Sequence, residues 1–251
     1  MNNSEKFEYL LRLGDNVLIL GQRLSEWCGH GPALEEDIAL TNHALDYLGQ
    51  ATLLLKHAGE TEGAGRDEDQ LAFLRDAPEF RNCLIVELPV GDYAFTVARQ
   101  FVFSTWYELV LEQLLNSTDE FLREFAAKSI KEARYHKQHA QDWVLRLGDG
   151  TDESHSRMQK AFDEIWNYTP ELFEMDELEK SAVAAGVGPD LNEIRTAWSE
   201  KMKETLQAAT LQMPADGWGH KGGKRGNHTE HLGYILADMQ FLQRAYPNAR
   251  W

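Results

Sequence analysis

Apolar residues recur every three or four positions along several segments, which is the spacing of a helix that buries one face. The first segment, about 6–27, carries them at Leu10, Leu13, Val17, Leu20, Leu24 and Trp27. The second, about 33–58, repeats the spacing at Ile38, Thr41, Leu45, Leu48, Thr52 and Leu55. Each set is expected to face a core. Two further long helices are predicted over about 92–116 and 119–147.

These four segments predict an all-α fold, a four-helix bundle with additional C-terminal helices packed against it. The additional helices are expected at about 154–168, 192–211 and 228–246, while Gly- and Pro-containing stretches separate the elements. Residues 59–69 and 213–227 are expected to be loops. We predict one domain over residues 1–251, with the core bundle at about 6–147 and the additional helices at about 154–246.

The charge balance of the chain limits the kinds of molecule that it is expected to bind. The chain has 41 acidic and 25 basic side chains, so its formal net charge is -16. Such a surface repels phosphate backbones and anionic lipids, which argues against binding to nucleic acid or membranes. No apolar stretch approaches the roughly 20 residues that span a bilayer. The two cysteines, Cys28 and Cys83, form no paired motif and fit a reducing compartment, so a cytoplasmic protein is expected.

Candidate chemistry is concentrated in the segment 119–147. Glu132, His136 and His139 continue the three-four spacing that begins at Leu122, and acidic partners on other predicted helices are Glu26, Asp46 and Glu108. Carboxylate and imidazole groups on one buried face are typical of a metal or catalytic site. The cluster of five, Glu26, Asp46, Glu108, Glu132 and His136, therefore resembles a metal site.

A di-iron carboxylate site would need a Glu-x-x-His pair on each of two helices. None of the predicted helices has a glutamate three positions before a histidine. The nearest pair, Glu132 and His136, is four positions apart. Only His155 follows an acidic residue by three, Asp152, in a stretch expected to be a loop. We therefore interpret the five residues as a degenerate site without metal and without a catalytic residue.

Other interpretations of these residues stay open. Glu132, His136 and His139 fit a buried hydrogen-bonded cluster or a partly exposed flank of the helix. A single metal bound by His136 and His139 is a further alternative. Glu26 and Asp46 fit interhelical hydrogen bonds equally well.

A basic, glycine-rich loop precedes the last helix, with the sequence GHKGGKRG over 219–226. Lys221, Lys224 and Arg225 stand out in an acidic chain, and glycines let backbone amides approach an anion. The loop could contact the phosphates of a coenzyme or an acidic face of a partner, or it could be a solvated loop. His228 and His231, just after it, are expected to cap the helix and contact the surface, with a metal site as the alternative.

Several blocks of sequence resemble one known family. They cover nearly the whole chain in order: RLGDN, QRLSEWCGH, DIALTN, LDYLGQA, KEARYH, RLGDGTD, GGKRG, HTEHLG and LADMQFLQR. The chain resembles the C-subunit family of ring 1,2-phenylacetyl-CoA epoxidases, the multicomponent oxygenases of aerobic phenylacetate breakdown. The resemblance implies a ferritin-like fold.

The resemblance also implies partners and cofactors. The di-iron centre would lie in a homologous catalytic A subunit, which this chain would bind and stabilise as a structural subunit. Electrons would come from NADPH through a reductase subunit with flavin and an iron-sulfur centre. Contacts with other epoxidase subunits, contact with the acyl-CoA and a homodimer of the isolated chain are left open. The competing interpretation is a metal-dependent ferritin-like oxidoreductase with an atypical site.

Overall fold

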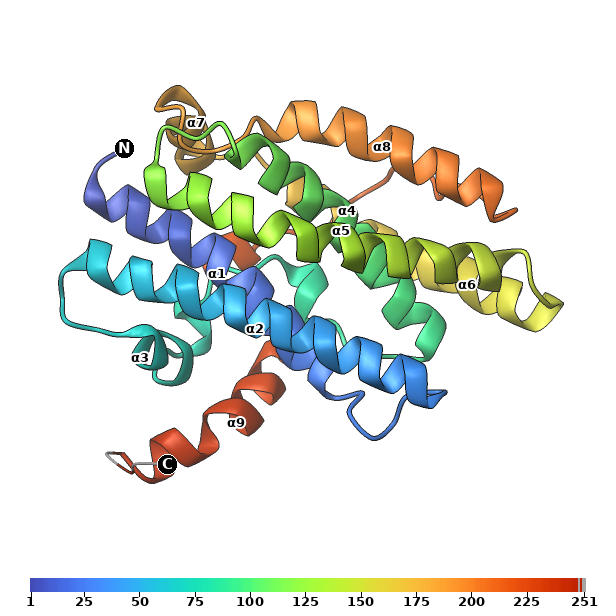
Figure 1. Cartoon of the computed structure of the whole chain (residues 1–251), viewed down its shortest axis with the longest axis horizontal. Coiled ribbons are helices and arrows are strands. Elements are labelled where there is room, and N and C mark those ends of the chain that lie inside the picture. The colour runs from blue at the N-terminus through green and yellow to red at the C-terminus, as the bar shows by residue number, and fades with distance from the viewer. Residues whose placement is uncertain (248, 250–251) are drawn as a thin grey trace. The chain divides into compact units, whose positions relative to one another are not determined.

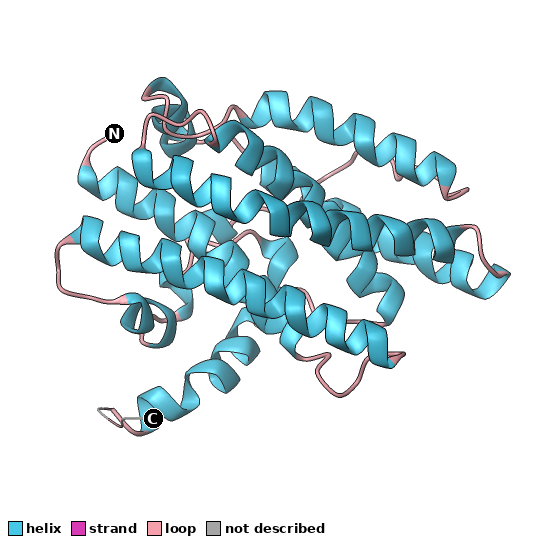
Figure 2. Ribbon diagram, viewed as in Figure 1, coloured by secondary structure: helices cyan, strands magenta, loops and turns pink. Residues whose placement is uncertain are grey.

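The computed structural model describes residues 1–247 and 249 (Figures 1 and 2). Over these residues the chain forms helices and no strand, so the all-α prediction is confirmed. The α-helices are α1 (Asn3–Ser25), α2 (Leu34–Glu62), α3 (Glu68–Phe73), α4 (Tyr93–Leu114), α5 (Glu120–Gly148), α6 (Asp152–Ile165), α7 (Glu177–Ala184), α8 (Leu191–Ala208) and α9 (Glu230–Ala245). Short 3-10 segments are η1 (Ala77–Glu79), η2 (Leu84–Glu87), η3 (Trp166–Phe173) and η4 (Gly223–Arg225).

The chain divides into two compact units. The first contains residues 1–89 and the segment that begins at Lys221, and the second contains residues 90–220. Helices α1 and α2 belong to the first unit, while α4 and α5 belong to the second. The single domain and the four-helix arrangement therefore stay predictions. None of the helices in the described part of the chain is long and apolar enough to cross a membrane.

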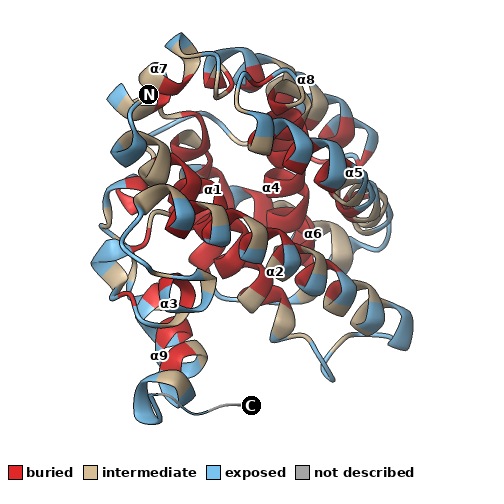
Figure 3. Ribbon diagram, turned by 60° about the vertical axis from the view of Figure 1, so that its left-hand side comes forward, coloured by how far each residue is buried: buried red, intermediate tan, exposed pale blue. Residues whose placement is uncertain are grey.

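In the first unit, α1 and α2 lie side by side along most of their length (Figures 1 and 3). Asn2 begins α1 by accepting a hydrogen bond from the amide of Glu5, whose carboxylate in turn accepts from the amide of Asn2. The predicted stripe is buried from Leu10 to Leu24, with Leu10, Val17 and Leu24 fully so, while Trp27 lies beyond the end of α1 and is half-buried. Gly14 permits the close packing, because a Cβ there would lie 3.0 Å from the side chain of Leu55.

The predicted buried face of α2 is wrong. Ile38 and Leu45 are 52% and 61% exposed, Thr52 is also exposed, and of the predicted set only Leu55 is fully buried. The buried face lies on the other side of the helix: Leu40, Ala44, Tyr47, Ala51, Leu54, Leu55 and Ala58. The helix carries two apolar stripes of the same period, and periodicity alone does not say which one meets the core.

In the second unit, α4 is buried along nearly its whole length and packs against α5, α6 and α8. The indole nitrogen of Trp198 on α8 donates to the carbonyl of Val102 on α4 at 3.1 Å. Trp198 also lies 5.4 Å from Trp166, ring centre to ring centre, and both are buried.

The buried face of α5 is turned by about one residue from the predicted one. Leu122, Phe125, Ser129 and His136 are buried as predicted, and the rest of the buried face consists of Ala126, Ile130, Ala133, Ala140, Val144 and Gly148. Glu132 and His139 are therefore only half-buried at its edge.

Two short helices, α3 and α7, were not predicted. Residues 59–69 were expected to be a loop, yet α3 begins within them because Asp67 and Gln70 form reciprocal capping hydrogen bonds. The helix predicted over 154–168 ends as α6 at Ile165 and continues as η3, which contains Pro170. These differences lie at element ends and in short elements, where local capping outweighs periodicity.

Candidate functional site

Glu108 on α4 is the most buried carboxylate of the predicted cluster, with 5% of the residue exposed. It faces two cations from α5. Its Oε2 lies 2.7 Å from the Nζ of Lys137, and its Oε1 lies 3.4 Å from the Nε of Arg134. Arg134 also holds Glu112 at 3.0 Å, and this hydrogen bond raises the pKa of the guanidinium. The negative charge of Glu108 is thus balanced by side chains of the chain itself.

The two histidines of α5 are in different environments. His136 is fully buried on the face that packs in the second unit. His139 is half-buried, and its ring stacks on that of Tyr135 with centroids 6.4 Å apart. A metal bound by both imidazoles would need them on one buried surface, which the phase of the helix does not provide.

The remaining members of the predicted cluster, Glu26 and Asp46, belong to the first unit. Glu26 follows the last residue of α1, is exposed, and pairs with the Nη1 of Arg23 at 2.6 Å. Asp46 is half-buried on α2. Among the described residues, no group of three or more His, Cys, Asp or Glu side chains is placed to hold a metal ion.

Asp152 lies in the first turn of α6 and not in a loop, and the Nδ1 of His155 lies 2.7 Å from the carbonyl oxygen of Gly148.

The glycine-rich loop packs against the segment 78–84 of its own unit. A Cβ at Gly223 would lie 2.1 Å from the carbonyl oxygen of Asn82, and one at Gly226 would lie 2.2 Å from that of Pro78. Gly226 also has a φ of 78°, a left-handed conformation that favours glycine. These glycines are required by close backbone packing within the chain.

The three cations of this loop are not equivalent. Lys224 is buried, with 3% of the residue exposed, whereas Lys221 and Arg225 are exposed. An anion approaching from solvent can therefore reach two of the three predicted residues, Lys221 and Arg225, without rearrangement of the loop.

Glu87 anchors the start of the last helix, and no sequence motif singled it out. Its Oε1 accepts from the amide of Thr229 at 2.8 Å, and its Oε2 lies 3.1 Å from the Nδ1 of His228. The other ring nitrogen of His228 lies 3.0 Å from the carbonyl oxygen of Phe80. Both ring nitrogens therefore lie within hydrogen-bond distance of an oxygen atom, which fixes the position of the ring. The expected surface role of His228 is wrong, since only 4% of its side chain is exposed.

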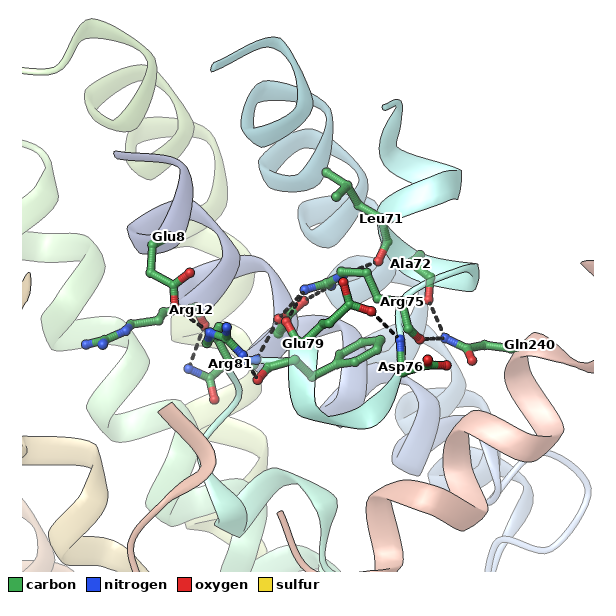
Figure 4. Close-up of polar contacts among 12 residues, drawn as sticks. Glu8, Arg12, Leu71, Ala72, Arg75, Asp76, Glu79, Arg81 and Gln240 are labelled. Atoms are coloured by element: carbon green, nitrogen blue, oxygen red, sulfur yellow. Dashed lines mark hydrogen bonds and ion pairs between the residues drawn. The ribbon is translucent and has the colours of Figure 1, made fainter. Parts of the chain in front are cut away.

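A second buried ion pair was also not predicted (Figure 4). Asp15 and Arg75 are 0% and 2% exposed, and the guanidinium binds the carboxylate through both terminal nitrogens, one of them at 3.0 Å. The backbone amide of Arg81 donates to the same carboxylate at 2.8 Å. The guanidinium of Arg75 lies over the ring of Phe80, with its Cζ 4.2 Å from the ring centre. Gln240 of α9 donates to the backbone carbonyl of Arg75 at 2.9 Å.

These buried polar groups bind each other, so the clusters are suited to holding helices together. The signal for Asp15 was present in the sequence, because Asp15 and Asn16 interrupt the apolar run of the first helix. The partners were not predictable, since Arg75 lies 60 positions along the chain.

An open hollow of about 640 Å³ lies on the first unit between α9 and η1. Its lining includes Leu236, Ala237 and Phe241. The charged residues that line it, Asp76 and Arg244, pair with each other at 2.9 Å. The hollow therefore offers apolar contact area and no group suited to acid or base catalysis.

Comparison with known proteins identifies the class of this all-helical chain. The model of the family described as phenylacetic acid catabolic protein matches residues 1–251, so the chain belongs to that family. The family is ferritin-like, which confirms the predicted fold class.

The chain is also similar to a particular protein, the C subunit of the 1,2-phenylacetyl-CoA epoxidase of Escherichia coli (strain K12). The two are 47% identical over 243 residues, which cover 97% of this chain and 98% of that protein. The resemblance found in the sequence is confirmed.

Proposed function

We propose that the chain is a non-catalytic structural subunit of a di-iron oxygenase that epoxidises the ring of phenylacetyl-CoA. In this role it binds and stabilises the catalytic A subunit, which carries the di-iron centre and activates oxygen. The electrons come from NADPH through the flavin and iron-sulfur groups of a reductase subunit. The name of the Escherichia coli relative supports this assignment, since an epoxidase with a lettered subunit implies other subunits.

The observation that carries the proposal is the state of Glu108. Iron in a carboxylate site needs oxygen donors whose negative charge balances the positive charge of the metal. The carboxylate of Glu108 is already held by Lys137 at 2.7 Å and by Arg134 at 3.4 Å. A metal would have to displace a cation that the chain itself supplies. The donor set of this chain therefore does not fit the di-iron group, and no step of the reaction is assigned to it.

A smaller part of the proposal concerns Lys221 and Arg225. These exposed cations belong to a loop whose glycines pack closely against the backbone of Pro78 and Asn82, in a chain of net charge -16. They are suited to an acidic group, either on the catalytic subunit or on the phosphates of its acyl-CoA. Lys224 is assigned to internal packing because it is buried.

The test is co-expression of the chain with the catalytic subunit, followed by measurement of complex formation, iron content and phenylacetyl-CoA turnover. We expect a stable complex, iron that follows the catalytic subunit alone, and loss of turnover when this chain is omitted. In the same assay, Lys221→Ala combined with Arg225→Ala should weaken either complex formation or acyl-CoA affinity, while the exposed pair Lys160→Ala and Arg195→Ala serves as the control.

Two results would contradict the proposal. Stoichiometric iron in the isolated chain would favour the alternative, a metal-dependent oxidoreductase that uses Glu26, Asp46, Glu108, Glu132 and His136. Unaltered turnover of the catalytic subunit without this chain would remove the structural role.

A further inference from the structure

One outward stripe of α2, in the first unit, carries no charged side chain from Leu34 to Thr52, and Lys56 follows one turn later. Six exposed residues lie on it at helical spacing and define what we call the α2 outer face: Leu34, Ile38, Asn42, Leu45, Gly49 and Thr52. Leu34, Ile38 and Leu45 are 71%, 52% and 61% exposed. The outward side of α2 is coloured as intermediate or exposed along its length in Figure 3.

This face differs from an ordinary solvated helix face. Charged residues make up 26% of the chain, yet none of the six positions carries a charge over five helical turns. The exposed side of α5, by contrast, carries Arg123, Lys131 and Arg134. Large exposed apolar surface is unfavourable in water, and contiguous patches of it mark interaction sites.

Gly49 supplies a second, independent observation. A glycine inside a helix destabilises it relative to alanine, so its presence needs a structural reason. At Gly14 and Gly59 the reason is internal, because an added Cβ would lie 3.0 Å from Leu55 and 2.0 Å from the carbonyl of Arg66. At Gly49 an added Cβ would meet nothing within 4 Å among the described residues, as is also the case at Gly233 of α9. A small residue in the middle of an apolar helix face permits close approach of a second helix from outside.

The charges beside the face indicate which kind of molecule covers it. The first turn of α2 is acidic, with Glu35, Glu36 and Asp37 next to Leu34 and Ile38. A second copy of this chain would bring the same acidic turn and another net charge of -16. An anionic membrane surface is disfavoured for the same reason. A helix of a different subunit, apolar along one side and basic opposite the acidic turn, complements both the shape and the charge.

We propose that the α2 outer face is the surface on which the catalytic subunit docks one of its helices. This assignment rests on the proposed function and adds the surface and the chemistry of its partner. Leu34, Ile38 and Leu45 provide the apolar contacts, Gly49 sets the closest approach of the two helix axes, and Glu35 binds a basic residue of the partner helix.

The rival surface in the same unit is the exposed side of α9. It presents Tyr234 and Phe241, which are 64% and 63% exposed, and it borders the open hollow. Its exposed positions include Asp238 and Arg244, so charges interrupt the apolar area. This makes α9 a matched control of the same unit, the same element type and similar exposure.

The experiment compares Ile38→Glu combined with Leu45→Glu against Tyr234→Glu combined with Phe241→Glu, each in the full chain. Dissociation constants for the purified catalytic subunit are measured by titration calorimetry, and melting temperatures check folding. The α2 pair should weaken binding by about 100-fold or more, because two central apolar contacts are replaced by buried charges. The α9 pair should change the dissociation constant by less than about threefold.

Hydroxyl-radical footprinting of the wild-type complex gives a second measurement that does not depend on variants. The side chains of Ile38 and Leu45 should become protected from oxidation when the catalytic subunit is bound, while Tyr234 and Phe241 should react as in the free chain.

The inference is overturned if wild-type chain binds and the α2 pair binds within about threefold of it, or if the α9 pair alone loses binding. It is also overturned if the α2 pair only converts a dimer of the isolated chain to monomer, which would assign the face to a second copy. A wild-type chain that does not bind the catalytic subunit refutes the proposed function itself, and the docking assignment with it.

Discussion

Helices α1 and α2 lie side by side in the first unit, yet they place charge and apolar area in opposite ways. α1 buries charged and polar groups, among them Arg12, Asp15, Asn16 and Arg23. α2 leaves leucine and isoleucine in solvent at Leu34, Ile38 and Leu45.

The difference follows from what each surface meets. Asp15 meets Arg75 inside the chain, and Arg23 donates to the backbone carbonyl of Glu87 at 2.9 and 3.1 Å. Buried charge is tolerated because these partners satisfy it. Leu34, Ile38 and Leu45 of α2 stay exposed among the residues that the structure describes, so their apolar area is available for contact with another molecule. In this unit, the buried charges of α1 hold parts of the chain together, whereas the exposed apolar residues of α2 are suited to contact with another molecule.

The largest effect is expected at the buried ion pair of Asp15 and Arg75. Asp15→Ala leaves the guanidinium of Arg75 buried without its carboxylate, and breaking a buried pair in this way costs about 3–5 kcal/mol. The free energy of unfolding, measured by urea denaturation, should fall by that amount. Replacing both partners, Asp15→Leu with Arg75→Met, should cost clearly less, since no buried charge remains. Equal losses in the two variants would show that packing volume, and not charge, explains the effect.

The two faces of α2 provide the second prediction. Leu54→Ala removes a fully buried side chain and should lower the free energy of unfolding by about 2–5 kcal/mol. Leu45→Ala, nine positions earlier on the outer face, should change it by less than about 0.5 kcal/mol in the isolated chain. Thermal or urea unfolding of the two variants measures the difference. A large loss at Leu45 would mean that the outer face is covered by the chain itself.

The smallest effect is expected at the ion pair of Glu62 and Arg66, at the C-terminal end of α2. Glu62 ends α2 and binds the guanidinium of Arg66, and this hydrogen bond lowers the pKa of the carboxyl. A lowered pKa in the folded state stabilises the fold above the unfolded pKa, and the gain is lost as pH falls through the folded value. Glu62→Gln should therefore cost about 0.2–1 kcal/mol at pH 7 and nothing at strongly acid pH. A cost that does not change with pH would exclude the charge as its source.

The parts of the fold that were predictable are those decided by local sequence. Residues 6–27, 92–116 and 119–147 were predicted as helices because their periodicity extends over several turns, and α1, α4 and α5 lie there. The predicted stripe of α1 is buried from Leu10 to Leu24, because nearly every residue between Tyr9 and Leu24 is buried. Of the candidate site, Glu108 and His136 are buried, Asp46 and Glu132 are half-buried, and Glu26 is exposed.

The sequence by itself determined the helical class, the family and the lack of Glu-x-x-His pairs, because these depend on residue order and on spacing within one turn. Only the tertiary structure decided which of two apolar stripes of α2 faces the core, that Lys137 neutralises Glu108, and that Asp15, Arg75, Glu87 and His228 form buried pairs. Such contacts join residues up to 141 positions apart along the chain. A pattern of local period carries no information about them, because their energy depends on distance in space after the chain has folded.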